Sequence, residues 1–237
     1  MELSVNCLIE LYKLASLGKM TSGLIHNING PLQNIGLDLE MSQYMLKKEA
    51  QRNEGIILPR LRRIEEELER LNTMIKASSN RITRAEDNHL LNFNDYLDQE
   101  LFFLNTNLYY KHNVKTTLDL PDKPPLVSSF PENSILAFGW LLQYVIEEIE
   151  KIKGSTLYIG AIKNHDFFEV KIATGVNGLF SRLNKIIADT DFNSDKLDVP
   201  ETDSAVMLIL KIFHSKGIFI KTENKYSSDI VICFHPG

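Results

Sequence analysis

The sequence predicts an α+β protein in which an antiparallel helical hairpin, residues 1–85, precedes an α/β sandwich, residues 86–237. Residues 1–85 have apolar positions at helical spacing and little strand signal. A polar segment that ends in glycine, residues 47–55, divides them into two helices. Beyond residue 88, strand-like segments alternate with apolar helices, which indicates a mixed sheet with helices on one face.

The second helix of the hairpin carries a heptad seam, in which apolar residues alternate in steps of four and three. Its members are Ile57, Leu61, Ile64, Leu68, Leu71, Ile75 and Ile82, with Ser78 at one position. The first helix has a similar seam from Leu14 to Ile35, which Leu32 and Leu39 widen. One hairpin cannot cover both seams, so we expect two copies to pair through residues 1–85 as a four-helix bundle, a homodimer. The alternative is a coiled-coil spacer without chemistry.

The second half of the chain has the order of segments expected for a sheet covered by helices. Residues 90–93 are a short strand candidate, and Asn94 is a candidate N-cap for the helix that follows. Trp140 lies in a strongly apolar helix. The other expected elements are strands at 114–120, 156–163, 167–174, 218–224 and 229–235, helices at 131–152 and 204–217, and an acid-rich loop at 184–203.

Composition excludes several classes of function. The chain has 237 residues, 43% hydrophobic and 24% charged, which is ordinary globular usage. Its formal net charge of -5 argues against a general nucleic-acid binder, which needs a basic surface. No apolar run approaches the roughly 18 residues of a membrane helix. Cys7 and Cys233 lie far apart and have neither zinc spacing nor a disulfide pattern, so we expect a cytoplasmic protein.

One histidine stands on the outer face of the first helix. Leu24 and Ile28 bracket the seam, and His26, two residues from each, points about 180° away from them at 100° per residue. Pro31 lies inside the same helical pattern, where proline costs about 3 kcal/mol and is better understood if it shapes a site. A surface histidine is usually only solvated. Small neighbours such as Gly30 leave this ring open, and an open imidazole can attack phosphorus near neutral pH.

The surrounding stretch, GKMTSGLIHNINGPLQNI at residues 18–35, resembles the phosphoacceptor box of bacterial two-component histidine kinases. Gly18, His26, Pro31 and Leu32 match its pattern. The resemblance implies that His26 is the phosphoacceptor, that residues 1–85 are the dimerisation and phosphotransfer hairpin, and that residues 86–237 are an ATPase-type domain of the GHKL class. The family's acid after the histidine is replaced by Asn27, and its hydrolytic position by Gly30. Asn27, Gly30 and Pro31 are therefore expected to shape the site without supplying a general base.

The family's nucleotide-binding motifs are missing from the second domain. Its magnesium-holding asparagine corresponds to Glu147, beside Glu148 and Glu150, and unpaired carboxylates there repel phosphate. Its adenine-binding aspartate has no counterpart near Thr174 and Gly175. No glycine occurs between Gly178 and Gly217, where the family has a glycine-rich phosphate loop. We therefore expect a degenerate domain that does not bind ATP.

The resemblance and these losses together predict a phosphotransfer protein of two-component signalling without ATP-dependent autokinase activity. His26 would exchange a phosphoryl group with the aspartate of a response-regulator receiver domain. The chain would hold no cofactor of its own, since the receiver brings Mg²⁺, and an upstream histidine kinase is a further expected partner. Two alternatives stay open: an active sensor kinase with a diverged ATP site, and a non-enzymatic pseudokinase that binds a receiver domain or a kinase.

Overall fold

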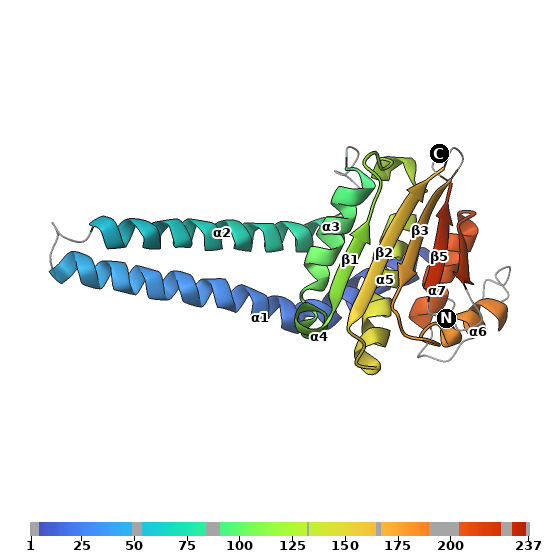
Figure 1. Cartoon of the computed structure of the whole chain (residues 1–237), viewed down its shortest axis with the longest axis horizontal. Helices are drawn as coiled ribbons and strands as arrows, with labels where there is room; N and C mark the ends of the chain where they lie inside the picture. Colours follow the sequence, from blue (N-terminus) through green and yellow to red (C-terminus); the bar gives the residue numbers. More distant parts are fainter. Residues whose placement is uncertain are drawn as a thin grey trace.

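The structure is a computed structural model that describes residues 5–48, 54–83, 91–131, 133–164, 167–189, 204–223 and 229–235. Two long helices, α1 (Val5–Lys48) and α2 (Glu54–Thr83), form an antiparallel hairpin that projects from one end of an α/β domain (Figure 1). The predicted α+β class and the helical hairpin are confirmed. The start of α1 extends beyond α2 and packs against the α/β domain, where Ile9 joins the main core.

The heptad seam is only half covered within one hairpin. Three members on α2 are buried or half-buried: Ile57, Ile64 and Leu71. The alternate members remain exposed: Leu61, Leu68 and Ile75. On α1, residues spaced by seven are exposed in the same way: Ile25, Leu32, Leu39 and Leu46. We call these seven exposed residues the uncovered stripe.

A buried carboxylate ties the two helices of the hairpin together. Asp38 of α1 accepts hydrogen bonds from Arg60 Nη1 at 2.7 Å and from Arg63 Nη2 at 2.9 Å, both on α2. Its side chain is 12% exposed, and that of Arg60 is 20% exposed. The pair is therefore shielded enough for the loss of one partner to matter.

Replacing Asp38 by alanine is expected to lower the free energy of unfolding by about 2 kcal/mol, because it leaves Arg60 half-buried without its anion. This expected loss of stability is smaller than the usual cost of breaking a buried ion pair, because the second partner, Arg63, is largely exposed to water. Chemical denaturation measures the effect. Glu40→Ala, an exposed carboxylate on the same helix, is the matched control and should change stability little. Equal stability of the two variants would contradict a structural role for the Asp38 pair.

The α/β domain is built on one mixed sheet of five strands. They are β1 (Lys115–Asp119), β2 (Thr156–Lys163), β3 (Phe168–Ala173), β4 (Phe219–Glu223) and β5 (Asp229–Phe234). The order across the sheet is β1-β2-β3-β5-β4. The pair β1 and β2 is parallel and the other neighbours are antiparallel. The predicted strands and mixed sheet are therefore confirmed.

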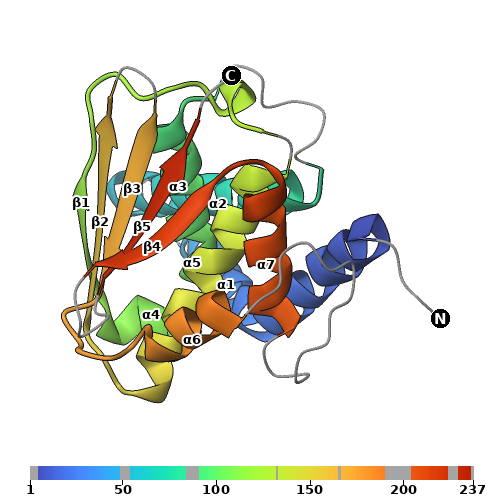
Figure 2. The same cartoon turned by 90° about the vertical axis from the view of Figure 1, so that its right-hand side faces the viewer.

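Helices cover one face of this sheet (Figure 2). They are α3 (Phe93–Leu104), α4 (Leu108–Asn113), α5 (Ser134–Lys151), α6 (Ser181–Asp189) and α7 (Ser204–Ser215), with a short 3-10 helix at Val127–Ser129. The core between helices and sheet is aromatic. Phe93 packs edge-on against Phe168 with ring centroids 4.8 Å apart, and Trp140 is fully buried. Within the described residues, no helix combines the length and apolarity needed to cross a bilayer.

Two local predictions were wrong. Asn92, not Asn94, caps α3: its Oδ1 accepts from the Asp95 backbone N–H at 2.9 Å, and the expected strand at 90–93 is reduced to a single bridge between Asn92 and Leu126. The expected loop at 184–203 is helical up to Asp189, because Leu183 and Ile186 bury an apolar face on the core. The rest of that loop lies outside the described residues.

Candidate functional site

His26 lies on the solvent-exposed side of α1, as the helical wheel predicts. Leu24 and Ile28 are half-buried and Pro31 is buried, so this face of α1 is the covered one. The helix continues through Pro31 without interruption from Val5 to Lys48. His26 is therefore held on a long helix and is exposed to solvent.

A pocket of about 300 Å³ opens beside His26, between the hairpin and α4. Its lining residues are neutral or basic: His26, Asn27, Asn29, Gly30, Pro31, Gln33, Asn34, Arg70 and Lys111. Among the described residues, this lining holds no carboxylate, in contrast with the net acidity of the chain. An anion would meet two cationic side chains here, one of which, Arg70, lies 3.8 Å from the carboxylate of Glu67 beside the pocket.

Asn27, the residue after the histidine, joins α1 to the α/β domain. Its Nδ2 donates to the backbone carbonyl of Asn105 at 2.9 Å. Its Oδ1 accepts from Lys111 Nζ at 2.7 Å. Both ends of the amide are therefore engaged, which fixes its orientation and places an ammonium group next to the histidine position.

Gly23 lets α1 approach the domain closely one turn before His26. A Cβ built on Gly23 would lie 1.6 Å from the carbonyl oxygen of Thr106, so no side chain fits there without movement. Gly30, one turn after His26, has nothing within 4 Å of such a Cβ. The two glycines have different effects: Gly23 permits a backbone contact, and Gly30 keeps the histidine pocket open.

Helix α4 is anchored at several points, which positions Lys111. Asn107 caps it by accepting from the Tyr110 backbone N–H at 2.8 Å and donates from Nδ2 to Glu150 Oε2 at 2.9 Å. The Tyr110 hydroxyl lies 2.8 Å from Thr116 Oγ1 on β1. Burial raises the pKa of Tyr110, against the opposing effect of that hydrogen bond, so the phenol stays protonated at neutral pH.

The start of α1 covers part of α5, the helix that carries Glu147. Tyr12 packs edge-on against Trp140 with ring centroids 4.5 Å apart. One turn later, Ser16 Oγ donates to Gln143 Oε1 at 2.6 Å, and both side chains are buried. A helix therefore occupies the surface over which a ligand of α5 would lie.

Each of the three glutamates of α5 has a hydrogen-bond partner in the chain, and two of these partners are cationic. Lys19 Nζ donates to both carboxylate oxygens of Glu147 at 3.2 Å. Glu148 pairs with Lys151 on the same helix, and Glu150 accepts from Asn107. Among the described residues, no group of three or more His, Cys, Asp or Glu side chains is arranged to hold a metal ion.

The two glycines that follow β3 serve a turn. Gly175 and Gly178 have φ values of 65° and 79°, in the left-handed region that favours glycine. Thr156 Oγ1 donates to the Thr174 carbonyl at 2.8 Å, which fixes the chain where β3 ends. The local conformation therefore accounts for both glycines.

Sequence reasoning missed the two cationic residues of the His26 pocket, Lys111 and Arg70. Lys111 lies 85 positions after His26, in a short helix without a recognisable motif. Arg70 is spaced i,i+4 from Glu66, which is typical of a solvated helical ion pair, but in the structure it lies 3.8 Å from Glu67. Lys111 joins the pocket because α4 packs beside α1, and Arg70 joins it because α2 does.

Comparisons with known proteins give only distant similarities. No protein family profile and no curated protein matches the sequence. A solved structure of a bacterial phosphotransferase is similar at 13% identity and a TM-score of 0.46, covering 93% of this chain and 96% of that one. The histidine kinase AdeS of Acinetobacter baumannii is similar at 16% identity and a TM-score of 0.44, covering 90% and 98%. At scores this low, the geometry around His26 carries the functional inference.

Proposed function

We propose that the chain is a cytoplasmic phosphotransfer protein of two-component signalling, in which His26 exchanges a phosphoryl group with the aspartate of a receiver domain. The observation that carries this proposal is an exposed histidine beside a pocket of about 300 Å³ whose described lining includes the cations Lys111 and Arg70. The resemblance of residues 18–35 to the phosphoacceptor box supports it.

The transfer needs little from this chain besides access. The lone pair of an imidazole nitrogen attacks phosphorus, the P–O bond to the receiver's aspartate breaks, and the carboxylate leaves with the electron pair. The proton on the other ring nitrogen stays in place. An in-line approach requires the ring to be open, and the receiver's own Mg²⁺ neutralises the phosphoryl oxygens.

Two features of the structure, the covering of α5 and the bonding of Asn27, support transfer without autokinase activity. Helix α1 covers α5 through Tyr12 and Ser16, and Lys19 already pairs with Glu147, where the family places its magnesium ligand. Asn27 uses both ends of its amide in structural hydrogen bonds and is not a base. We therefore expect no ATP-dependent phosphorylation of His26.

The uncovered stripe supports a homodimer through residues 1–85. Its seven apolar residues run along both helices at heptad spacing, and each side chain is between 43% and 57% exposed. Pairing with a second copy brings two such stripes together as a four-helix bundle. Each side chain covered in this way contributes about 1 kcal/mol.

The test mixes the chain with receiver domains of the same organism that carry a labelled phosphoryl group, in the absence of ATP, and follows transfer of this label to the chain. Native protein should accept the label within the mixing period. His26→Gln should accept none, because glutamine lacks a nucleophilic nitrogen. His112→Gln, which removes an exposed histidine outside the pocket, should behave as native. Equal labelling of native protein and His26→Gln would contradict the proposal.

The same assay separates the alternatives. Labelling of His26 by Mg-ATP alone would show an active kinase, and calorimetric titration with Mg-ATP should instead give no binding heat. Binding of a receiver domain without any transfer would show a non-enzymatic regulator.

A further inference from the structure

We infer that Lys111 and Arg70 bind the phosphoryl group carried by His26, so that the phosphotransfer site is built jointly by the hairpin and the α/β domain. This inference rests on the proposed function and adds its anion-binding residues. The ligand is the phosphoryl group in transit between an acyl phosphate and the imidazole.

The pocket has the charge and size that such a group requires. Its volume of about 300 Å³ exceeds that of a phosphoryl group, and, of the residues that the structure describes, the formally charged ones in its lining are Lys111 and Arg70. A phosphoryl group brings close to two negative charges into the pocket. Charge-assisted hydrogen bonds from two cations are the strong kind that proteins use for this purpose.

Lys111 is held where it can reach the phosphoryl oxygens. Its Nζ lies 2.7 Å from Asn27 Oδ1, and Asn27 directly follows His26 on α1. The amide is held in this orientation by its bond to the Asn105 carbonyl. An ammonium group has three donors, so one can remain on Asn27 while others meet the phosphoryl group.

Arg70 approaches the pocket from α2. Its guanidinium lies 3.8 Å from Glu67 Oε2, beyond hydrogen-bond length, while the other oxygen of Glu67 accepts from Asn34 Nδ2 at 2.8 Å. The planar guanidinium fork matches two oxygens of a phosphate group. The two cations therefore reach the pocket from different elements and do not depend on each other.

The two cations should stabilise the transition state and the phosphorylated histidine. During transfer the N–P bond forms as the P–O bond to the receiver's aspartate breaks, and the three peripheral oxygens keep their negative charge throughout. Removing one charged donor should slow acceptance roughly tenfold or more and shorten the lifetime of the phosphorylated chain.

The experiment compares native protein with Lys111→Met, Lys111→Arg, Lys111→Gln and Arg70→Met. Each is phosphorylated by phosphoramidate, a small donor that releases ammonia as the new N–P bond forms, and by a phosphorylated receiver domain. Lys111→Met and Arg70→Met should each accept the group about tenfold more slowly. Lys111→Arg should restore most of the rate because it retains the charge, whereas Lys111→Gln, which keeps a donor for Asn27 without the charge, should stay slow. A merely structural role in holding Asn27 predicts native rates for Lys111→Gln.

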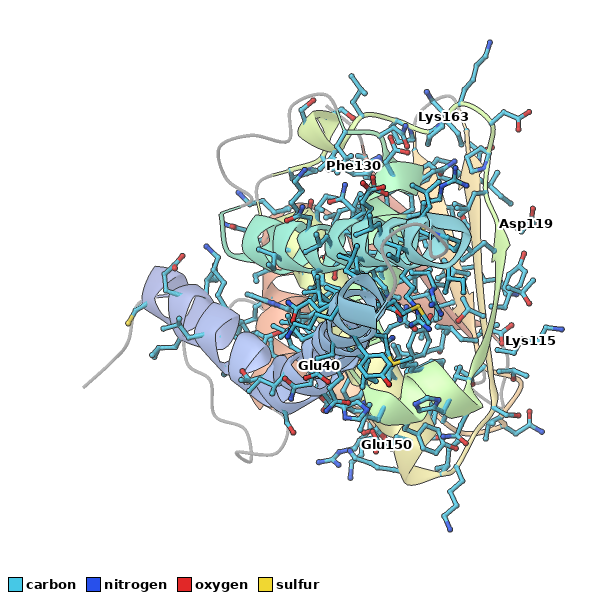
Figure 3. The ribbon with its side chains drawn as sticks, turned by 90° about the vertical axis from the view of Figure 1, so that its left-hand side faces the viewer. Glu40, Lys115, Asp119, Phe130, Glu150 and Lys163 are labelled. Atoms are coloured by element: carbon cyan, nitrogen blue, oxygen red, sulfur yellow. The ribbon has the colours of Figure 1, made fainter. Side chains whose placement is uncertain are left out.

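Lys115→Met is the matched control. Lys115 is an exposed lysine on the edge strand β1, on the outer side of the sheet (Figure 3), and does not line the pocket. This variant should behave as native with both donors. Native rates in Lys111→Met and Arg70→Met would overturn the inference while leaving the proposed function intact. A native chain that accepts no phosphoryl group at His26 from either donor would overturn both.

Discussion

Replacing both Leu61 and Leu68 by glutamate should convert the proposed homodimer into monomers. Both residues belong to the uncovered stripe and are 43% and 48% exposed within one chain. In a four-helix bundle they would meet the same residues of the second copy, so the double variant places four carboxylates in an apolar interface. Burying unpaired charge in that way costs several kcal/mol and should raise the dissociation constant at least a thousandfold.

Light scattering of the native chain and the variant measures this effect directly as molar mass. Ile162→Glu is the control. Ile162 is 60% exposed on β2, outside the hairpin, so this variant should have the same molar mass in solution as the native protein. A monomeric native chain, or a double variant that remains dimeric, would contradict pairing through the uncovered stripe.

Gly23→Ala should destabilise the chain although alanine is the better helix former. Helix propensity alone favours alanine by about 1 kcal/mol. The new methyl group would lie 1.6 Å from the Thr106 carbonyl oxygen, and that backbone cannot yield as a flexible side chain would. Overpacking of this kind costs about 1–3 kcal/mol or more, so the clash should dominate and push α1 away from the α3–α4 corner.

The consequence reaches the proposed phosphoacceptor His26, because the bonds from Asn27 to Asn105 and Lys111 lie one turn beyond Gly23. Chemical denaturation gives the change in stability, and hydrogen exchange at α4 reports whether the corner opens. Gly36→Ala is the matched control, since nothing lies within 4 Å of a Cβ there and the substitution should stabilise by about 0.5–1 kcal/mol. If both alanines stabilise the chain, the close contact at Gly23 does not exist.

The parts of the fold that the sequence predicted are those encoded locally. The heptad seam from Ile57 to Ile75 predicts a helix and its covered face because every member lies within a turn or two of the next. The exposure of His26 follows from its angle to Leu24 and Ile28 in the same way. The strands of the sheet follow from local alternation, which needs no knowledge of their partners.

The missed features depend on how distant segments meet. The contact of Lys111 with Asn27 joins residues 84 positions apart and arises only after α4 packs on α1. The packing of Tyr12 and Ser16 against α5 is another long-range contact. The apolar face at the start of α1 does not by itself indicate which surface will cover it. Even the N-cap of α3 was misplaced by two residues, because Asn92 and Asn94 are equally good caps in isolation.

The central claim is that His26 takes its phosphoryl group from a receiver domain and not from ATP. The most direct measurement is to incubate native chain with a receiver domain phosphorylated by acetyl phosphate, without ATP, and to locate the transferred group by mass spectrometry under alkaline conditions. The account predicts one acid-labile, base-stable phosphoramidate per chain, in the peptide that contains residue 26. An acid-stable phosphate, a group on another residue, or labelling that occurs only when Mg-ATP is supplied would contradict it.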